Sequence, residues 1–146
     1  MAKDGKIIVY TQGVWDMFHI GHLNILKAAK SFGDILIVGV NKDELVKQYK
    51  GHYPLLCWKD RAAVVASCKY VDVVIPTDSL EKDQLLKDID ADVMVHGNDK
   101  EVLGSEYMRK NNRRVVYLPY TEGRSSTQLR QALNRFYEEQ KGDSKL

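Results

Sequence analysis

The sequence predicts a doubly wound α/β fold, a Rossmann-like parallel five-stranded sheet with helices on both faces. Short runs of β-branched and apolar residues alternate along the chain with longer segments of helical periodicity. The apolar runs are nearly continuous, which is typical of parallel strands that are covered on both faces. Five of these runs are expected to be strands, over residues 7–11, 35–40, 71–75, 93–96 and 115–118.

The segments between the strands have the spacing of amphipathic helices. In the first helix, Leu23, Leu26 and Ala29 recur at helical spacing, and Gly33 is the expected stop. Four further helices are expected over residues 43–48, 60–67, 81–90 and 105–111. Strands and helices that alternate in this way, joined by right-handed crossovers, give the doubly wound architecture.

The last helix begins with a capping-box pattern, Ser125 followed three residues later by Gln128. Its apolar residues form one stripe that is expected to face the core, namely Leu129, Ala132, Leu133 and Phe136. From about residue 140 the composition turns polar, and a frayed tail is expected there.

Composition and charge restrict the class of protein. The chain has 146 residues, 44% of them hydrophobic and 29% charged, which predicts a single globular domain over residues 1–146 with its core at about 7–139. The net charge of +2 is too small for binding to nucleic acid or to an anionic membrane by bulk electrostatics. We expect a cytoplasmic protein, because Cys57 and Cys68 form no disulfide framework and no signal peptide is evident.

Chemically rich loops follow four of the expected strands, after Thr11, Val40, His96 and Leu118. In an open parallel sheet, ligands bind beyond the carboxyl ends of the strands, where the strand order reverses. The four loops are therefore expected to meet at one edge of the sheet and to form a binding site there.

The first of these loops predicts a phosphate site. Residues 13–22 run from the end of a strand into the start of a helix, whose free N–H groups and positive dipole end attract anions. His19 and His22 are three residues apart and each can donate an N–H to one anion, while Gly21 allows close approach to the backbone. The alternatives are surface or capping histidines without a ligand, or a zinc site. The pair has no third ligand at short spacing, so no protein-bound metal is predicted.

The loop after the second strand offers positive charge. Lys47 and Lys50 precede Gly51, so a lysine on this segment can close over a triphosphate, and Arg61 opens the next helix. The alternative is a solvated helix end whose lysines suit the dipole.

Two more loops belong to the binding site that is predicted at this edge of the sheet. Asn98 and Asp99 form a turn signal, and can also hydrogen-bond a base or an acceptor substrate. The loop after the fifth strand supplies a second phosphate cradle, or simply a capped helix start, with the residues Thr121, Gly123, Arg124, Ser125, Ser126 and Thr127.

Together these motifs resemble the cytidylyltransferases of the nucleotidyltransferase superfamily, from about residue 7 to residue 133. The shared elements are the His-x-Gly-His signature at residues 19–22, the Lys50-Gly51 loop, the Tyr-Val-Asp stretch at 70–72, Gly-Asn-Asp at 97–99 and Thr-Glu-Gly-x-Ser-Ser-Thr at 121–127. The same His-Ile-Gly-His occurs in class I aminoacyl-tRNA synthetases, but 146 residues leave no room for tRNA-binding modules.

The resemblance implies transfer of CMP from CTP to a small phosphorylated alcohol, with release of pyrophosphate. Glycerol 3-phosphate is the first expected acceptor and phosphoethanolamine the second. It also implies a homodimer and Mg²⁺ carried by the nucleotide triphosphate. The implied catalytic residues are His19, His22 and Lys50. The implied binding residues are Gly13, Val14, Trp15, Asp16, Gly21, Lys47, Arg61, Asn98, Asp99, Thr121, Gly123, Arg124, Ser125, Ser126 and Thr127.

Three departures from the cytidylyltransferase pattern leave alternatives open. Tyr120 replaces the family's Arg before Thr-Glu-Gly, Lys69 replaces an Arg before Tyr-Val-Asp, and Arg130 completes a Ser-Ser-x-x-x-Arg pattern that adenylyltransferases share. Heptose-phosphate adenylyltransferases also share the Lys-Gly loop and the Asp-Arg-Ala-Ala stretch at 60–63. The alternative functions are therefore an adenylyltransferase for a heptose phosphate and a nucleotide-binding module without catalysis.

Overall fold

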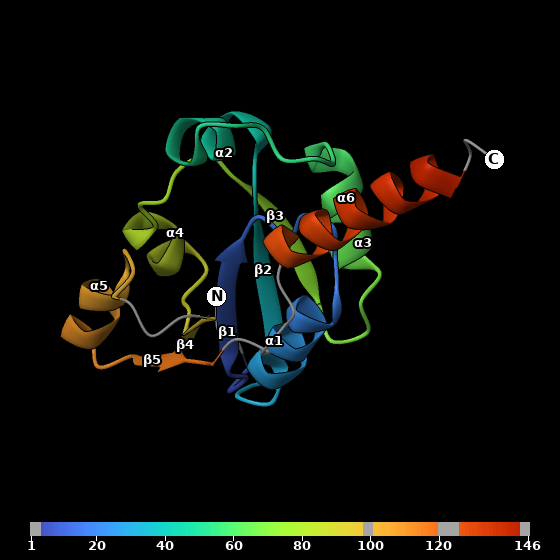
Figure 1. Ribbon diagram of the computed structural model, residues 1–146. Coiled ribbons are helices and arrows are strands. Elements are labelled where there is room, and N and C mark those ends of the chain that lie inside the picture. The colour runs from blue at the N-terminus through green and yellow to red at the C-terminus, as the bar shows by residue number, and fades with distance from the viewer. Residues whose placement is uncertain (1–3, 98–100, 120–125, 144–146) are drawn as a thin grey trace.

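The structure, a computed structural model, describes residues 4–97, 101–119 and 126–143, and it confirms the predicted doubly wound α/β fold. Five parallel strands form one sheet in the order β3-β2-β1-β4-β5. The strands are β1 (Ile8–Gly13), β2 (Ile35–Asn41), β3 (Val73–Thr77), β4 (Val93–His96) and β5 (Arg114–Tyr117). The order reverses at β1, whose two neighbours, β2 and β4, belong to different halves of the chain (Figure 1).

Helices cover both faces of the sheet. On one face, α1 (Ile20–Lys30) and α3 (Trp58–Ala66) pack Leu26, Ala29 and Val65 against the strands. On the other face, α4 (Asp83–Asp88) and α5 (Ser105–Lys110) contribute Leu86 and Met108. The core therefore consists of two apolar layers with the sheet between them, as expected when apolar strands are buried on both sides.

One glycine in β2 makes room for a buried phenol. A Cβ added to Gly39 would lie 2.2 Å from the hydroxyl oxygen of Tyr10, so a larger residue there would displace that ring. Tyr10 is fully buried and donates its hydroxyl hydrogen to Gln12, with 2.6 Å between the two oxygens. Burial raises the pKa of Tyr10, so the phenol stays neutral.

The third strand differs from the prediction. It begins at Val73, two residues later than expected, because Asp72 instead binds neighbouring groups: its carboxylate accepts from the Leu36 amide at 2.7 Å and from the Lys30 ammonium at 2.6 Å. β3 is also an edge strand, and Val73 is exposed. The expectation that every strand is covered on both faces is therefore wrong for β3.

The last helix, α6 (Ser126–Asp143), does not pack as predicted. Leu129, Leu133 and Phe136 are exposed, Phe136 to 58%, and the distal half of the helix extends away from the sheet (Figure 1). Helical periodicity tells which side chains share a face but not whether another element covers that face. The helix also continues to Asp143, beyond the start of the expected frayed tail. None of the helices in the described ranges is long and apolar enough to cross a membrane.

Candidate active site

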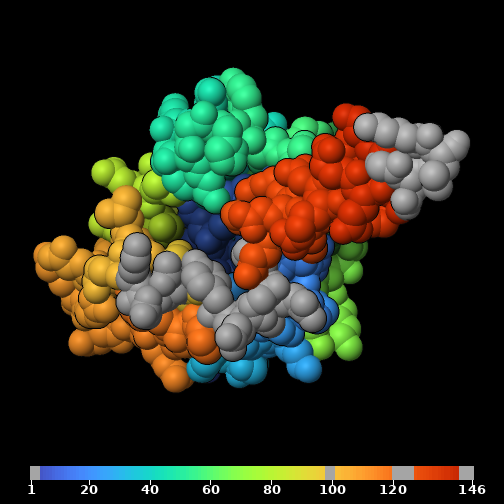
Figure 2. Space-filling view, viewed as in Figure 1, coloured from blue at the N-terminus to red at the C-terminus, as the bar shows by residue number. Residues whose placement is uncertain are grey.

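A cavity of about 730 Å³ opens at the carboxyl edge of the sheet. In the space-filling view, β1 lies at the bottom of a hollow between α2 (Asp43–Lys50) and the start of α6 (Figure 2). The predicted site residues that line this cavity are Gly13, Val14, Trp15, Asp16, His19, Gly21, His22, Lys50 and Thr127. The structure thus brings together side chains from the first loop, the end of α2 and the start of α6.

His19 and His22 form a reciprocal cap at the start of α1. The Gly21 amide donates to Nδ1 of His19 at 3.0 Å, and the His19 amide donates to Nδ1 of His22 at 3.2 Å. The two rings stack with their centroids 3.9 Å apart. Capping and ligand binding, which the sequence left as alternatives, are compatible here, because each cap uses one ring nitrogen and leaves the other.

The cap also determines where the ring protons are. Because Nδ1 of each ring accepts a hydrogen bond, each neutral ring carries its proton on Nε2, which is the donor it can offer to a ligand. Burial, together with the neighbouring His19, lowers the pKa of His22 to about 4, against an opposing effect of Asp16. Burial also lowers the pKa of His19. Both rings are therefore neutral donors near pH 7 until a bound anion favours protonation.

The loop before α1 is held by its tryptophan. The Trp15 indole donates to the carbonyl of Gly39 in β2 at 3.0 Å, and its ring meets His22 edge-on with 5.5 Å between centroids. A Cβ on Gly13 would lie 3.1 Å from the Trp15 ring, which explains the glycine at that position. Trp15 has a φ of 58°, in the left-handed region, so the surrounding contacts hold the loop in a strained conformation.

Asp16 and Arg61 join the first loop to the segment after α2. The Asp16 carboxylate accepts from the amides of Leu55 and Leu56, at 2.7 Å and 3.0 Å. Arg61 donates to the Val14 carbonyl at 2.6 Å and to the Asp43 carboxylate at 2.6 Å. Arg61 is fully buried and does not line the cavity, so the structure places it behind the wall instead of at the expected binding surface.

The two lysines of α2 occupy different positions. Lys50 lines the cavity at the end of the helix, where Gly51 caps it with a φ of 81°. The Lys47 ammonium instead donates to the Gly51 carbonyl at 3.2 Å and lies over the Tyr53 ring. Of the two, Lys50 is placed to meet a ligand and Lys47 stabilises the helix end.

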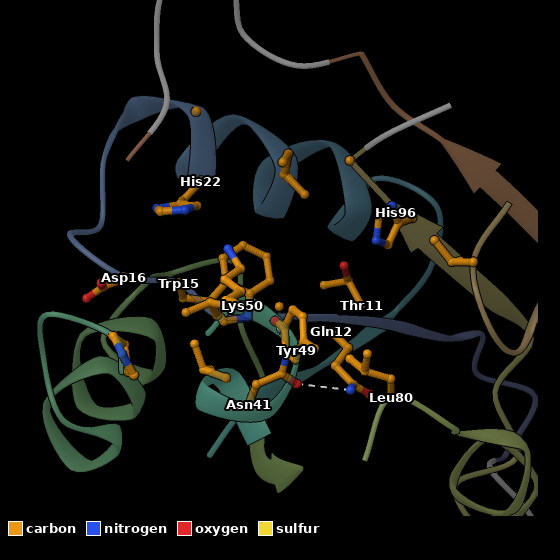
Figure 3. A pocket seen from close by; sticks show the side chains of 18 of the residues that line it. Thr11, Gln12, Trp15, Asp16, His22, Asn41, Tyr49, Lys50, Leu80 and His96 are labelled. Atoms are coloured by element: carbon orange, nitrogen blue, oxygen red, sulfur yellow. Dashed lines mark hydrogen bonds between the residues drawn. The ribbon is translucent and has the colours of Figure 1, made fainter. Parts of the chain in front are cut away.

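A polar floor below the cavity was not predicted from the sequence. Asn41, at the end of β2, accepts from Gln12 at 3.0 Å (Figure 3) and from Thr77 at 2.7 Å, and donates to the Tyr49 hydroxyl at 3.1 Å. Gln12 also donates to the Ser79 carbonyl at 3.0 Å. The sequence signal was weak, since single amides at strand ends are ordinary and the network forms only when β1, β2 and β3 lie side by side.

Two cationic residues in the cavity wall were absent from the predicted site. Arg130, on the first turns of α6, lies 3.8 Å from the Asp16 carboxylate. Lys82, at the start of α4, is buried and donates to the Leu103 carbonyl at 3.1 Å. Arg130 had a signal in its Ser-Ser-x-x-x-Arg pattern, whereas Lys82 had none.

Several predicted residues lie outside the described ranges. These are Asn98, Asp99, Thr121, Gly123, Arg124 and Ser125, together with Tyr120. Ser126 begins α6, and its side chain is likewise outside the description. Their predicted roles stay predictions.

Comparisons with known proteins place this chain in a family. The chain matches the family model described as cytidylyltransferase-like over residues 10–132. The Bifunctional protein HldE of Campylobacter fetus is 37% identical over 131 residues, which cover 87% of this chain and 28% of that protein. That of Nitratiruptor sp. is 40% identical over 133 residues, again 28% of its length. The chain thus spans less than a third of the length of these curated relatives.

A solved structure shares the fold. The lipopolysaccharide core biosynthesis protein from Thermoplasma volcanium superposes with a TM-score of 0.71 at 27% identity, covering 81% of this chain and 100% of that one. The doubly wound sheet and its His-x-Gly-His helix start define the class of nucleotidyltransferases. Within that class, the chain belongs to the cytidylyltransferase-like family.

Proposed function

We propose that this nucleotidyltransferase transfers AMP from ATP to a sugar phosphate of the heptose phosphate type, giving an ADP-sugar and pyrophosphate. The relatives named Bifunctional protein HldE support this alternative better than the expected CTP-dependent transfer to glycerol 3-phosphate. The similarity to a lipopolysaccharide core biosynthesis protein points to sugar chemistry in the same way. The Lys-Gly loop and the Asp-Arg-Ala-Ala stretch, which resemble heptose-phosphate adenylyltransferases, are consistent with it.

The observation that carries the proposal is the position of Arg130. It belongs to the Ser-Ser-x-x-x-Arg pattern shared with adenylyltransferases, and it lines the cavity together with His19 and His22. A guanidinium and two imidazole N–H donors at two helix starts can neutralise and bind one polyphosphate.

The chemistry requires positioning more than side-chain reactivity. An oxygen of the acceptor phosphate attacks the α-phosphorus of the nucleotide, and the bond from that phosphorus to the oxygen bridging to the β-phosphate breaks. The acceptor oxygen is already an anionic nucleophile, so no general base is needed. His19 and His22 stabilise the charge of the transition state through Nε2–H, and Lys50 stabilises the leaving pyrophosphate or the acceptor phosphate.

Magnesium is proposed to arrive with the nucleotide. Asp16 is the one carboxylate among the described residues that line the cavity, and it already accepts two backbone N–H bonds. Mg²⁺ prefers few protein ligands and several phosphate and water oxygens, so these residues fit a metal carried by the triphosphate. When bound, it would neutralise charge on the phosphates.

The remaining predicted binding residues complete the proposal. Thr127, which lines the cavity, would bind the β/γ end of the nucleotide with Arg124, Ser125 and Ser126. Asn98 and Asp99 would hydrogen-bond the base or the acceptor. We also propose a homodimer, which the family resemblance implies. The solution mass tests it, and would be twice the chain mass of 16.7 kDa.

The decisive experiment measures pyrophosphate release for ATP and CTP, each with a heptose 1-phosphate, glycerol 3-phosphate and phosphoethanolamine. We expect release with ATP and the heptose phosphate. Release with CTP and glycerol 3-phosphate instead would show that the protein is a cytidylyltransferase. Nucleotide binding without release for every acceptor would identify a non-catalytic module.

A further inference from the structure

The polar floor of the cavity ends in a tyrosine hydroxyl. Tyr49, on the last turn of α2, lines the cavity, and its hydroxyl oxygen lies 3.1 Å from the Asn41 amide nitrogen. The Tyr49 side chain is exposed, whereas Asn41 and Thr77 are buried. Tyr49 is therefore the member of this network that is most open to a ligand.

The hydrogen bonds of the floor run in one direction, which a backbone carbonyl sets. The Ser79 carbonyl can only accept, so the Gln12 amide nitrogen faces it, and the same nitrogen donates to the side-chain oxygen of Asn41. The Asn41 oxygen also accepts from the Thr77 hydroxyl. The Asn41 nitrogen is thereby turned toward Tyr49, so the phenol oxygen accepts a hydrogen bond and its own hydrogen is left for another acceptor.

The hydrogen of the Tyr49 hydroxyl is available to a ligand. Among the residues that the structure describes, none accepts it. Burial raises the pKa of Tyr49, so the phenol keeps this hydrogen near pH 7. A donor that finds no acceptor costs free energy, and an oxygen of a bound ligand would remove that cost.

The position of the floor indicates which substrate it would meet. In doubly wound sheets a nucleotide binds in the crevice where the strand order reverses, which here separates β1 from β4. Asn41 ends β2, outside that crevice, and Figure 3 shows Tyr49 and Asn41 across the cavity from His22, which forms the histidine wall with His19. Besides burial and His19, the charge of Lys50 lowers the pKa of His22, so the end of α2 is within electrostatic range of this wall. A second substrate whose phosphate meets the nucleotide there can reach Tyr49 with its remaining atoms.

The chemistry of the floor indicates which group of that substrate it would bind. Its side chains are amides and hydroxyls without charge, whereas a phosphate is bound most strongly by charged donors. A sugar hydroxyl is a neutral oxygen that can accept the Tyr49 hydrogen. An ammonium group has only donors and would leave that hydrogen without an acceptor.

We propose that the Tyr49 hydroxyl donates its hydrogen to a hydroxyl oxygen of the acceptor sugar, and so selects sugar phosphates over phosphorylated amino alcohols. This inference rests on the proposed function, because it takes the second substrate to be a sugar phosphate. Tyr49 forms and breaks no covalent bond in the reaction. It determines which acceptor binds.

The test compares Tyr49→Phe with Tyr53→Phe. Each variant loses one phenol oxygen and keeps the ring, but the Tyr53 hydroxyl donates to Glu44, and Tyr53 is not among the described residues that line the cavity. A heptose 1-phosphate is titrated into each protein saturated with a non-reactive α,β-methylene analogue of ATP. Ethyl phosphate, which has no hydroxyl on its carbon atoms, is measured as a competitor.

The expected loss is selective. Tyr49→Phe should weaken binding of the heptose phosphate by about fivefold to tenfold, because one neutral hydrogen bond is lost. Its affinities for ethyl phosphate and for the ATP analogue should change by less than about twofold, as should all affinities of Tyr53→Phe.

A second variant, Asn41→Asp, tests the direction of the network without removing the hydroxyl. A carboxylate at this position can only accept, so the Tyr49 hydrogen would turn toward it and away from the cavity. We expect the same selective loss for the heptose phosphate, beyond any loss that the added negative charge causes for ethyl phosphate. Melting curves check that each variant is folded.

Several results would overturn the inference. Unchanged affinity of Tyr49→Phe for the heptose phosphate would show that the hydroxyl meets no substrate oxygen. Equal losses for the heptose phosphate and ethyl phosphate would show that Tyr49 acts on the phosphate and not on the sugar. Weakened binding of the ATP analogue alone would assign Tyr49 to the nucleotide. Absence of the selective loss in Asn41→Asp would contradict the direction of the hydrogen bond.

Failure of the proposed function gives a different result. If the wild-type protein binds the ATP analogue and the heptose phosphate, and Tyr49→Phe binds them equally well, the proposed function stands and the inference is wrong. If the wild-type protein binds a CTP analogue and glycerol 3-phosphate instead, the proposed function is wrong. The sugar in the inference is then wrong as well, and the same variants test whether Tyr49 donates to a glycerol hydroxyl.

Discussion

Helices α1 and α6 both begin at the cavity, but they are attached to the molecule very differently. The first turn of α1 carries the two histidines, and its later turns bury Leu26 and Ala29 completely. The first turns of α6 supply Arg130, yet its later residues Leu133 and Phe136 are exposed. The start of a helix is specified by residues close in sequence. The burial of its apolar face depends on another structural element, which the helix's own sequence does not identify.

The described contacts at the two helix starts are of different kinds. Side-chain bonds from Trp15, Asp16 and Arg61 fix the loop before α1 to β2 and to the segment after α2. An ion pair between Arg130 and Asp16, at 3.8 Å, joins α6 to that loop. A partly exposed pair at this distance contributes little to stability, whereas the bonds around the first loop preorganise the histidine wall.

The largest expected effect tests the preorganised wall. His22→Ala removes an Nε2–H donor that acts on the transition state, so kcat should fall by about 100-fold or more. Steady-state kinetics with the best substrate pair measure this. Lys27→Ala, an exposed change on the same helix, is the control and should leave kcat nearly unchanged. Near-normal turnover of His22→Ala would contradict the catalytic assignment.

A second expected effect concerns the support behind the wall. Arg61→Met leaves the Asp43 carboxylate and the Val14 carbonyl without their buried donor, so the free energy of unfolding should fall by about 2 kcal/mol. Urea denaturation measures this value. Arg109→Met, which removes an exposed pair with Glu101, should cost less than about 1 kcal/mol. Equal losses of stability in both variants would show that Arg61 does not hold the first loop in place.

A third, smaller effect is the pH dependence of stability. Since burial lowers the pKa of His22 to about 4, the unfolded chain binds a proton between about pH 6.5 and pH 4 that the folded protein does not. Stability is therefore full above that range and decreases as the pH falls. Between pH 7 and pH 5 the contribution is on the order of 1 kcal/mol. His22→Gln should lose this part of the dependence, and an unchanged profile in that variant would contradict the assignment.

Much of the fold could be predicted from the sequence because the information is local. The apolar runs predicted all five strands, and the polar loops predicted the edge at which the cavity forms. The late start of β3 could not be predicted, since it depends on Asp72 meeting Leu36 and Lys30 in the folded sheet. The exposure of α6 was missed for the same reason, as it reflects a packing partner and not the periodicity of the helix.

The site residues also divide into those that the local sequence predicts and those whose position depends on the whole fold. The His-x-Gly-His spacing predicted residues that act together on one helix turn, and the structure places both in the cavity. Arg61 was predicted to bind a ligand because its charge is visible in the sequence and its burial is not. Lys82 was missed because its neighbours Leu103 and Gly104 come from a distant segment of the chain. Charge is encoded locally, whereas burial is a property of the whole fold.

The smallest expected effect returns to α6. Phe136→Ser changes an exposed side chain, so the free energy of unfolding should change by less than about 0.5 kcal/mol. Leu26→Ser on α1 is the matched comparison, and it should cost more than about 3 kcal/mol because it leaves a cavity and buries a hydroxyl. Urea denaturation at low protein concentration measures both. A loss in Phe136→Ser comparable to that in Leu26→Ser would mean that the apolar face of α6 is covered in the folded protein, and the contrast between the two helices would then be confined to their first turns.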